Sequence, residues 1–330
     1  MKTQRYIRAI LFIVTLSTLC SCKVDFSPNA TWKEIPVVYC ILDQDDDTIW
    51  ARVQRCYLPE SSIDIPAQIS DSINFPEGYI KVDVLVQKGN TVRDTMHFTY
   101  TKRTIDTGIF ANTDQPLYYY VPTSKLDSTC TYRLLVTKTS TDSIIAEATT
   151  QLISMVEPEL IYSYGRPMFS FYGAGSTYNL VWYNLKNARR YEPIIRFYYS
   201  ENDGNDTLYQ DISCGSMVER RSVNQTQSIS YSQYHFLTDL KQALEDDPQP
   251  KKYLETVDIY IAACTEDLNA YINSSSSSVI EQSHNVYTNI TGGLGIFAAR
   301  RAHLFQNIPA DDGNTPGSLY AALRDLNVGF

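Results

Sequence analysis

Histidines, the side chains most often used in catalysis near neutral pH, are few and isolated in this 330-residue chain. The sequence contains no G-x-S-x-G nucleophile turn and no H-E-x-x-H pair. We therefore predict no catalytic residue, no cofactor and a protein that is not an enzyme. The four histidines are His97, His235, His284 and His303.

Two short runs rich in Asp and Asn, at 43–47 and 203–206, could offer oxygen ligands to calcium. Neither run has the spacing of an EF-hand loop. Turns also favour Asp and Asn, because these side chains hydrogen-bond to the nearby backbone. We interpret both runs as turns and predict no metal site.

Cys22 lies in the clearest motif of the chain. Three basic residues precede a nearly continuous apolar run at 9–19, which has the length of a signal peptide core and is too short to span a bilayer. The run ends in Leu-Cys-Ser-Cys at 19–22, which resembles the lipobox of bacterial lipoproteins. The motif predicts removal of residues 1–21 and lipid attached to Cys22, which would anchor the protein without a transmembrane helix. An ordinary cleaved signal with an incidental cysteine is the alternative.

Five more cysteines follow Cys22, an odd number at irregular spacing and without a C-x-x-C pair. This pattern is typical of neither a disulfide framework nor a zinc site. We interpret them as buried thiols, with a Cys40–Cys56 bridge across the first predicted hairpin as the alternative. The five are Cys40, Cys56, Cys130, Cys214 and Cys264.

Six Asp-Ser/Thr dipeptides are followed by an apolar residue or Thr, a triplet that resembles the O-glycosylation signal of Bacteroidota. A turn residue followed by the start of a strand would write the same triplet, so both interpretations stay open. The candidate acceptors are Thr48, Ser72, Thr95, Ser128, Ser143 and Thr207.

Tyrosine is abundant, with 25 copies, and several lie next to one another, as at 118–120 and 198–199. Adjacent residues of a strand point to opposite faces, so some of these rings should be exposed. Exposed Tyr suits sugar stacking or contact with a protein, whereas Tyr also fills half-buried strand positions.

Composition favours a folded acidic protein. The chain is 43% hydrophobic and 20% charged, which argues against disorder. Its net charge is −9 and it has no basic run after the signal, so nucleic acid is not an expected partner.

The elements that must position these residues are predominantly strands. After a tether at 22–33, about seven short runs of β-branched and aromatic residues occupy 34–152, one of them at 91–100. This spacing predicts one immunoglobulin-like or transthyretin-like β-sandwich domain. A joint is expected near Pro158.

The second half, 153–330, predicts another β-sandwich with short helical insertions, giving an all-β protein of two domains. Apolar periodicity and Ser or Thr caps predict helices near 232–246, 265–272 and 318–326, with a flexible serine tract at 273–278. Strands are expected at 168–172 and 295–304, among others.

Two stretches carry a resemblance to a known family. The segment Trp-Lys-Glu-Ile-Pro-Val-Val-Tyr at 32–39, after a lipobox and tether, and the segment Val-Tyr-Thr-Asn-Ile-Thr-Gly-Gly-Leu-Gly-Ile-Phe at 286–297 resemble an uncharacterised family of Bacteroidota outer-membrane lipoproteins. The resemblance implies a location at the outer membrane and genes often encoded near TonB-dependent receptors. It supplies no catalytic residue. Gly292, Gly293 and Gly295 are expected to allow a bend or a close backbone approach.

These observations predict a non-catalytic envelope lipoprotein that binds a ligand or assists an outer-membrane transporter. Its expected partners are the membrane, through Cys22, a TonB-dependent receptor or another envelope protein, and a glycan. The stretch Lys-Val-Asp at 23–25 partly resembles the acidic signal that sends lipoproteins of these bacteria to the cell surface, which favours the surface over the periplasmic face. A structural or adhesive role, and a hydrolase with an unrecognised site, are the alternatives.

Overall fold

The computed structural model describes most of the chain after the predicted tether. The predicted signal peptide and tether, with Cys22 between them, lie outside the described residues. The described ranges are 34–56, 73–104, 114–155, 159–161, 168–171, 175–201, 207–218, 226–244, 251–275, 287–309, 318–326 and 329–330.

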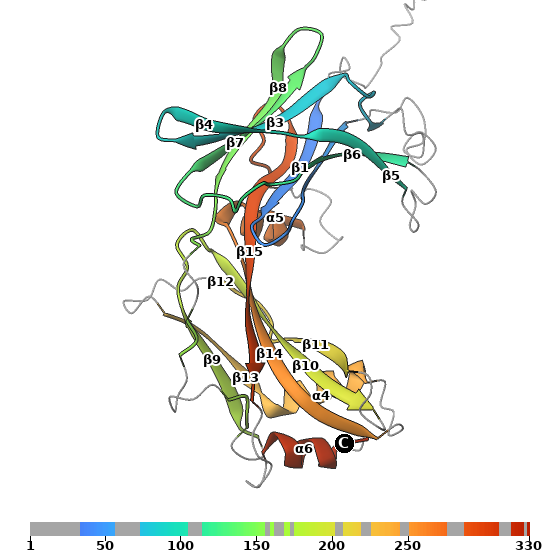
Figure 1. Cartoon of the computed structure of the whole chain (residues 1–330), viewed down its shortest axis with the longest axis vertical. Coiled ribbons are helices and arrows are strands. Elements are labelled where there is room, and N and C mark those ends of the chain that lie inside the picture. Colours follow the sequence, from blue (N-terminus) through green and yellow to red (C-terminus); the bar gives the residue numbers. More distant parts are fainter. Residues whose placement is uncertain are drawn as a thin grey trace, which may run out of the picture.

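Eight strands form two sheets of an N-terminal lobe (Figure 1). They are β1 (Pro36–Asp43), β2 (Ile49–Arg55), β3 (Ile80–Lys88), β4 (Thr91–His97), β5 (Thr99–Thr104), β6 (Asp114–Tyr120), β7 (Thr131–Lys138) and β8 (Ser143–Gln151). One antiparallel sheet has the order β4-β3-β7-β8, and β1-β2-β6-β5 forms one end of a longer sheet. Alternating buried residues of both sheets, such as Val38, Val84 and Leu134, enclose a common core.

The strand expected at 91–100 is divided between the two sheets. Its first part is β4, which pairs with β3, and its continuation is β5, which pairs with β6. Phe98 lies between them and donates its backbone N–H to the carbonyl of Val82. Because one chain segment serves both sheets, the N-terminal lobe is closed at this corner.

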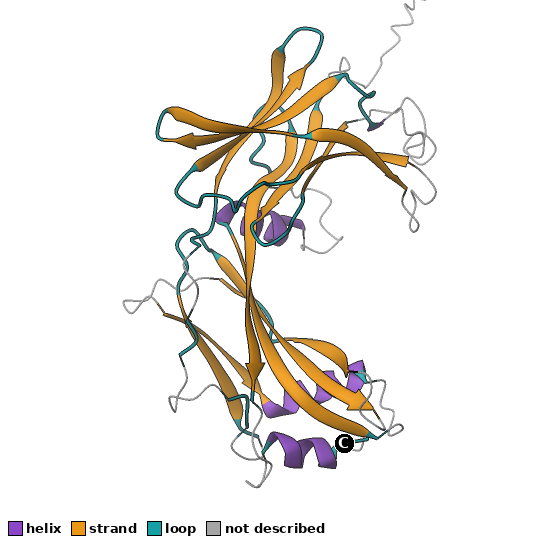
Figure 2. Ribbon diagram, in the orientation of Figure 1, coloured by secondary structure: helices purple, strands orange, loops and turns teal. Residues whose placement is uncertain are grey.

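The remaining elements form a C-terminal lobe together with one shared strand. The strands are β9 (Thr177–Tyr183), β10 (Arg190–Glu201), β11 (Thr207–Ser213), β12 (Met217–Val218), β13 (Thr226–Ser232), β14 (Lys252–Cys264) and β15 (Leu294–Ile308). The helices are α4 (Gln233–Ala243), α5 (Glu266–Ser275) and α6 (Leu319–Asp325). Strands dominate both lobes, so the predicted all-β class is confirmed (Figure 2).

Strand β15 belongs to both lobes. Its first residues pair in parallel with β1, from Val37↔Leu294 to Asp43↔Arg300, and its later residues pair antiparallel with β14, from Cys264↔Arg300 to Val257↔Ile308. The result is a nine-stranded sheet, here called the long sheet, with the order β11-β10-β14-β15-β1-β2-β6-β5 and with β12 beside β10. Figure 1 shows β15 running from one lobe into the other.

This pairing differs from the expectation that 153–330 forms the second domain by itself. Ile290, Phe297 and Ala299 pack in the core of the N-terminal lobe. The physical reason is that β1 would otherwise leave one backbone edge unpaired beside this core.

The glycines at 292–295 allow β15 to approach its neighbours closely, as expected. Gly295 has φ +106°, and an added Cβ would lie 2.0 Å from the carbonyl oxygen of Val38. An added Cβ on Gly293 would lie 2.6 Å from the carbonyl oxygen of Pro36. The Asn289 side chain fixes this segment, because it accepts from the Phe297 N–H at 2.9 Å and donates to the Phe297 carbonyl at 2.7 Å.

The two faces of the long sheet have different surroundings. Its inner face contributes to the core of each lobe, through Cys40 and Phe297 in one and Ile195 and Ile259 in the other. Its opposite face, here called the outer face, carries α5, which packs on a small cluster with Ile296. Helix α5 lies where the two lobes meet (Figure 2).

The predicted helices are present, whereas one predicted strand is not found in the described residues. Helix α4 begins after its cap Ser232, and α6 begins after its cap Ser318, as predicted. Helix α5 continues to Ser275, into the serine tract expected to be flexible, and the Ser274 and Ser275 hydroxyls donate to the Tyr271 carbonyl within its last turn. The strand expected at 168–172 is wrong in the described part, which has only an isolated bridge at Phe169.

Candidate functional site

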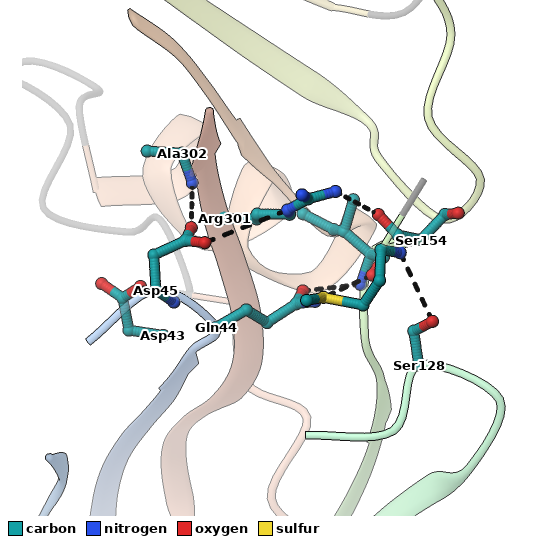
Figure 3. Close-up of polar contacts among 9 residues, drawn as sticks. Asp43, Gln44, Asp45, Ser128, Ser154, Arg301 and Ala302 are labelled. Atoms are coloured by element: carbon teal, nitrogen blue, oxygen red, sulfur yellow. Dashed lines mark hydrogen bonds and ion pairs between the residues drawn. The ribbon is translucent and has the colours of Figure 1, made fainter. Parts of the chain in front are cut away.

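Arg301 lies at the centre of the joint between the lobes. Its side chain is only 3% exposed, and Nη1 donates to the Ser154 carbonyl at 2.7 Å. Its Nε lies 4.0 Å from Oδ1 of Asp45, in the loop after β1. Figure 3 shows Arg301 between Asp45 and the Ser154 segment. A buried arginine thus joins three segments that are far apart in sequence.

Gln44 holds the same connecting segment through its amide group. Nε2 donates to the Ile153 carbonyl at 2.8 Å, and Oε1 accepts from the Ile153 N–H at 2.9 Å, so the side chain mimics a strand neighbour. The Ser128 hydroxyl accepts from the Met155 N–H at 3.4 Å (Figure 3). Asn187 also donates to the Leu152 carbonyl, at 2.8 Å. These contacts fix 152–155, just before the joint expected near Pro158, which lies outside the described residues.

Two acids of the run at 43–47 contact β15 at this joint. Asp43 accepts from Nε of Arg300 at 2.6 Å, and Asp45 accepts from the Ala302 N–H at 2.6 Å. Burial raises the pKa of Asp45, while the Ala302 N–H and the charge of Arg301 lower it. No cluster of three or more metal-ligating side chains occurs among the described residues. The second acidic run, 203–206, lies outside them.

Aromatic side chains project from the outer face in the N-terminal lobe. Trp50 on β2 is 44% exposed, and its ring lies 5.8 Å from that of Tyr119 on β6. Tyr39 on β1 is also exposed and meets Tyr271 of α5 edge to face, with 6.2 Å between ring centroids. Arg52 is opposite Tyr39 in the ladder. Sequence reasoning expected exposed tyrosines and missed Trp50.

A second aromatic cluster lies on the outer face in the C-terminal lobe. Arg196 forms a bidentate ion pair with Asp211, with N–O distances of 2.7 and 2.8 Å, and donates to the Tyr260 hydroxyl at 2.8 Å. Its guanidinium lies over the rings of Tyr209 and Tyr260, 4.3 and 4.7 Å from their centroids. The hydrogen bonds to Asp211 raise the pKa of Arg196. These arginine donors are therefore already engaged within the cluster.

A pocket of about 330 Å³ opens beside α5, between the two aromatic groups. Its walls combine apolar side chains of α5 with charged side chains of β10 and β15. The lining residues are Asp43, Arg190, Glu192, Ala262, Ala263, Cys264, Leu268, Ile272, Arg300, Arg301 and Ala302. Sequence reasoning missed these arginines, and the one available signal was the Arg300-Arg301 pair directly after the apolar run at 296–299.

The described cysteines are free thiols. Cys40 and Cys56 are unbonded, because the β1–β2 ladder places Cys40 opposite Ala51 whereas Cys56 meets Ile35 at the other end of the hairpin. Burial raises the pKa of Cys40 and Cys214 to about 12, and that of Cys264 to about 11. A thiol with a raised pKa is a poor nucleophile near neutral pH.

The described histidines lie apart. His97 pairs with Asp83 on the exposed side of β3 and β4, with 2.7 Å between Nδ1 and Oδ1. His235 lies in the first turn of α4, and the His303 ring stacks edge to face on Phe305. His284 lies outside the described residues. These surroundings supply no adjacent nucleophile and base.

The candidate glycosylation sites occupy different environments. Ser143 and Thr207 are exposed and begin β8 and β11. Thr48, Thr95 and Ser128 are half-buried, and Ser72 lies outside the described residues. The positions of Ser143 and Thr207 also fit the alternative interpretation, in which a turn residue precedes a strand.

We expect glycans on at least two of the six candidate acceptors in the native host, Ser143 and Thr207 first, because an acceptor hydroxyl must reach a transferase. Mass spectrometry of the native protein should show added hexose masses on the corresponding peptides. The double variant Ser143→Ala/Thr207→Ala should lose most of that mass, whereas Ser140→Ala, in the same turn as Ser143, should retain it. An intact mass equal to that of the peptide plus lipid alone would contradict the predicted glycosylation.

No described helix is both long and apolar enough to cross a membrane. No known family model matches the chain, and no curated protein matches it. A solved structure described as "Cytokine receptor complex - Crystal form 1A" aligns with 84% of this chain and 98% of its own, at 7% identity and a TM-score of 0.21. A score this low carries no conclusion about fold or function.

Proposed function

We propose that this protein is a non-catalytic lipoprotein, anchored through Cys22 at the bacterial outer membrane, that binds an envelope partner through the outer face of its long sheet. The observation that carries the proposal is the exposure of Trp50 and Tyr39 on that face. Large aromatic side chains at protein surfaces are enriched where partners bind, because they bury much area at little entropic cost. A TonB-dependent receptor is the proposed partner, and the cell surface is the proposed side.

The chemistry of the described side chains supports binding over catalysis. The buried thiols have raised pKa values, and Asp43 and Asp45 are engaged by β15. The hydrolase alternative would need acids or histidines that converge in a cleft. Two acids, Asp43 and Glu192, line the pocket beside α5, but Asp43 is paired with Arg300. The pocket therefore does not present two unpaired acids for hydrolysis.

A structural spacer of the cell envelope is the second candidate, and the joint favours it. Strand β15 passes through both lobes, and Arg301 and Gln44 fix the segment that connects them. Such a joint would hold the two lobes in one arrangement. A spacer would not require exposed Trp50.

The test is capture from native outer membranes with an internal tag. A tag belongs in the exposed turn between Ser140 and Thr141, because the C-terminal Phe330 packs on Phe197 and Tyr199. We expect the wild-type protein to co-purify with a TonB-dependent receptor, and Trp50→Ala to lose most of it. Cys22→Ala should leave the membrane fraction and fail to incorporate labelled palmitate, since the lipid is the proposed anchor and no described helix is long and apolar enough to span the membrane in its place.

Val92→Ala is the matched control, because Val92 is exposed on β4 in the other sheet. It should capture the receptor as the wild type does. Retention of processed Cys22→Ala protein in membranes would contradict the lipid anchor. Equal recovery of the same partners by wild type and Trp50→Ala would favour the spacer.

A further inference from the structure

We infer that the pocket beside α5 binds a compact carboxylate whose body carries hydroxyl or amino groups. The inference goes beyond the proposed function, because the pocket is lined by neither Trp50 nor Tyr39 and would take a small ligand. Amino acids and sugar acids share this chemistry. The relevant lining residues are Arg190, Glu192, Leu268, Ile272 and Arg300.

The pocket lining holds three arginines, Arg190, Arg300 and the buried Arg301, against the two acids Asp43 and Glu192, so its net charge is positive although the whole chain is acidic. Arg190, on β10, already donates to the Asn273 and Ser216 side chains, which orient its guanidinium. Arg300, on β15, uses Nε for Asp43 and is 58% exposed. A guanidinium has five N–H donors, so Arg190 and Arg300 have capacity for a further acceptor. In a protein of net charge −9, this place suits an anion that can accept several hydrogen bonds.

Glu192 sets the second requirement. It is exposed on β10, opposite Ala262 in the ladder, and lines the same pocket as the arginines. An ionised carboxylate accepts hydrogen bonds and donates none. A ligand that carried only negative groups would be repelled by it. Hydroxyl or amino donors on the ligand would satisfy Glu192 while the ligand carboxylate meets an arginine.

Size and the apolar wall limit the ligand further. Leu268 and Ile272 come from one side of α5 at a spacing of four residues, so they form one apolar surface along the pocket. A volume of about 330 Å³ is enough for a single amino acid or sugar ring with some water. Pockets of this kind combine apolar walls with a few polar groups that fix orientation.

The test is calorimetric titration of the detergent-solubilised mature protein. The probes are leucine and glutamate, glucuronate and gluconate, and the uncharged or carboxylate-free counterparts glucose and leucinol. We expect a carboxylate of one series to bind and its counterpart to bind at least tenfold more weakly, since hydrogen bonds to charged groups are strong. Binding by the amino acids alone, or by the sugar acids alone, identifies the source.

Variants locate the site. Arg190→Met should weaken binding about tenfold, whereas Arg93→Met, an equal loss of charge on exposed β4, should have no effect. Absence of binding by all four acids, or equal binding by Arg190→Met and wild type, would overturn the inference while leaving membrane capture untouched. Conversion of a bound ligand to product, seen by mass spectrometry, would instead overturn the proposed absence of catalysis.

Discussion

Replacement of Gly295 by alanine should destabilise the protein by about 4 kcal/mol or more, the range seen for severe single substitutions. Two costs combine. The backbone of Gly295 has φ +106°, a region that side chains with a Cβ rarely adopt and that costs about 1–3 kcal/mol. An added Cβ would also lie 2.0 Å from the Val38 carbonyl oxygen, so β1 and β15 would have to separate.

Separation would affect both lobes, because Val38 is paired with Gly295 in the long sheet. Val38 is fully buried in the core of the N-terminal lobe, and its backbone hydrogen bonds hold the shared strand beside β1. We expect a large fall in the urea midpoint of unfolding, or insoluble protein on expression.

Gly89→Ala is the matched control. Gly89 also has a positive φ, +60°, in the turn between β3 and β4, but an added Cβ there would meet no atom within 4 Å. Its cost should be the backbone term alone, about 1–2 kcal/mol. If the two variants unfolded at the same urea concentration, the close approach of β15 to β1 would not be present in solution.

Local signals predicted the elements whose boundaries depend on neighbouring residues. Ser232 and Ser318 cap their helices because the hydroxyl of each accepts from the N–H three residues later, a pattern visible in sequence. Alternation likewise predicted β3, with Val82 and Val84 buried. By contrast, β13 has the polar sequence Thr-Gln-Ser-Ile-Ser-Tyr-Ser, so no apolar period indicated it.

Pairing between distant segments could not be predicted from these signals. A strand at 295–304 was expected. Alternation of apolar and polar residues indicates which face of a strand is buried, but it does not identify the neighbouring strand. The parallel partner of β15 is β1, more than 250 residues earlier in the chain. The arginines of the joint and the pocket were missed for the same reason, because their acceptors Ser154, Ser216 and Asp43 are remote in sequence or on other strands.

Arg301→Met should destabilise the protein by about 2–3 kcal/mol, because a guanidinium that is itself buried would no longer donate to the Ser154 carbonyl. Methionine keeps much of the length and apolar volume of the side chain, so packing should change little. The Ser154 carbonyl would lose its donor at 2.7 Å, and Asp45 would lose a nearby positive charge. Arg300→Met, next along the strand, should cost less than about 1 kcal/mol, since the Arg300 side chain is 58% exposed and solvent weakens its ion pair with Asp43.

The destabilisation caused by Arg301→Met should also depend on pH. Burial raises the pKa of Asp45 above its unfolded value of about 3.9, so the contribution of Asp45 to stability is present below that pH and is lost as pH rises through the folded pKa. The charge of Arg301 lowers the pKa of Asp45, so Arg301→Met should raise that pKa further. The variant should then lose more stability than the wild type as Asp45 ionises in the folded state. The stability difference between variant and wild type should therefore grow as pH rises from about 4 and level off once Asp45 is ionised in both.

Urea unfolding of wild type and Arg301→Met at a series of pH values measures this difference, and NMR titration of the Asp45 carboxyl carbon measures the pKa directly. In an Asp45→Asn background the pH-dependent part should vanish, while the part due to the Ser154 carbonyl should remain. A difference that is constant with pH, together with an unchanged pKa of Asp45, would mean that Arg301 acts on the joint through Ser154 alone. A cost no larger than that of Arg300→Met would contradict a stabilising role for the buried arginine between the lobes.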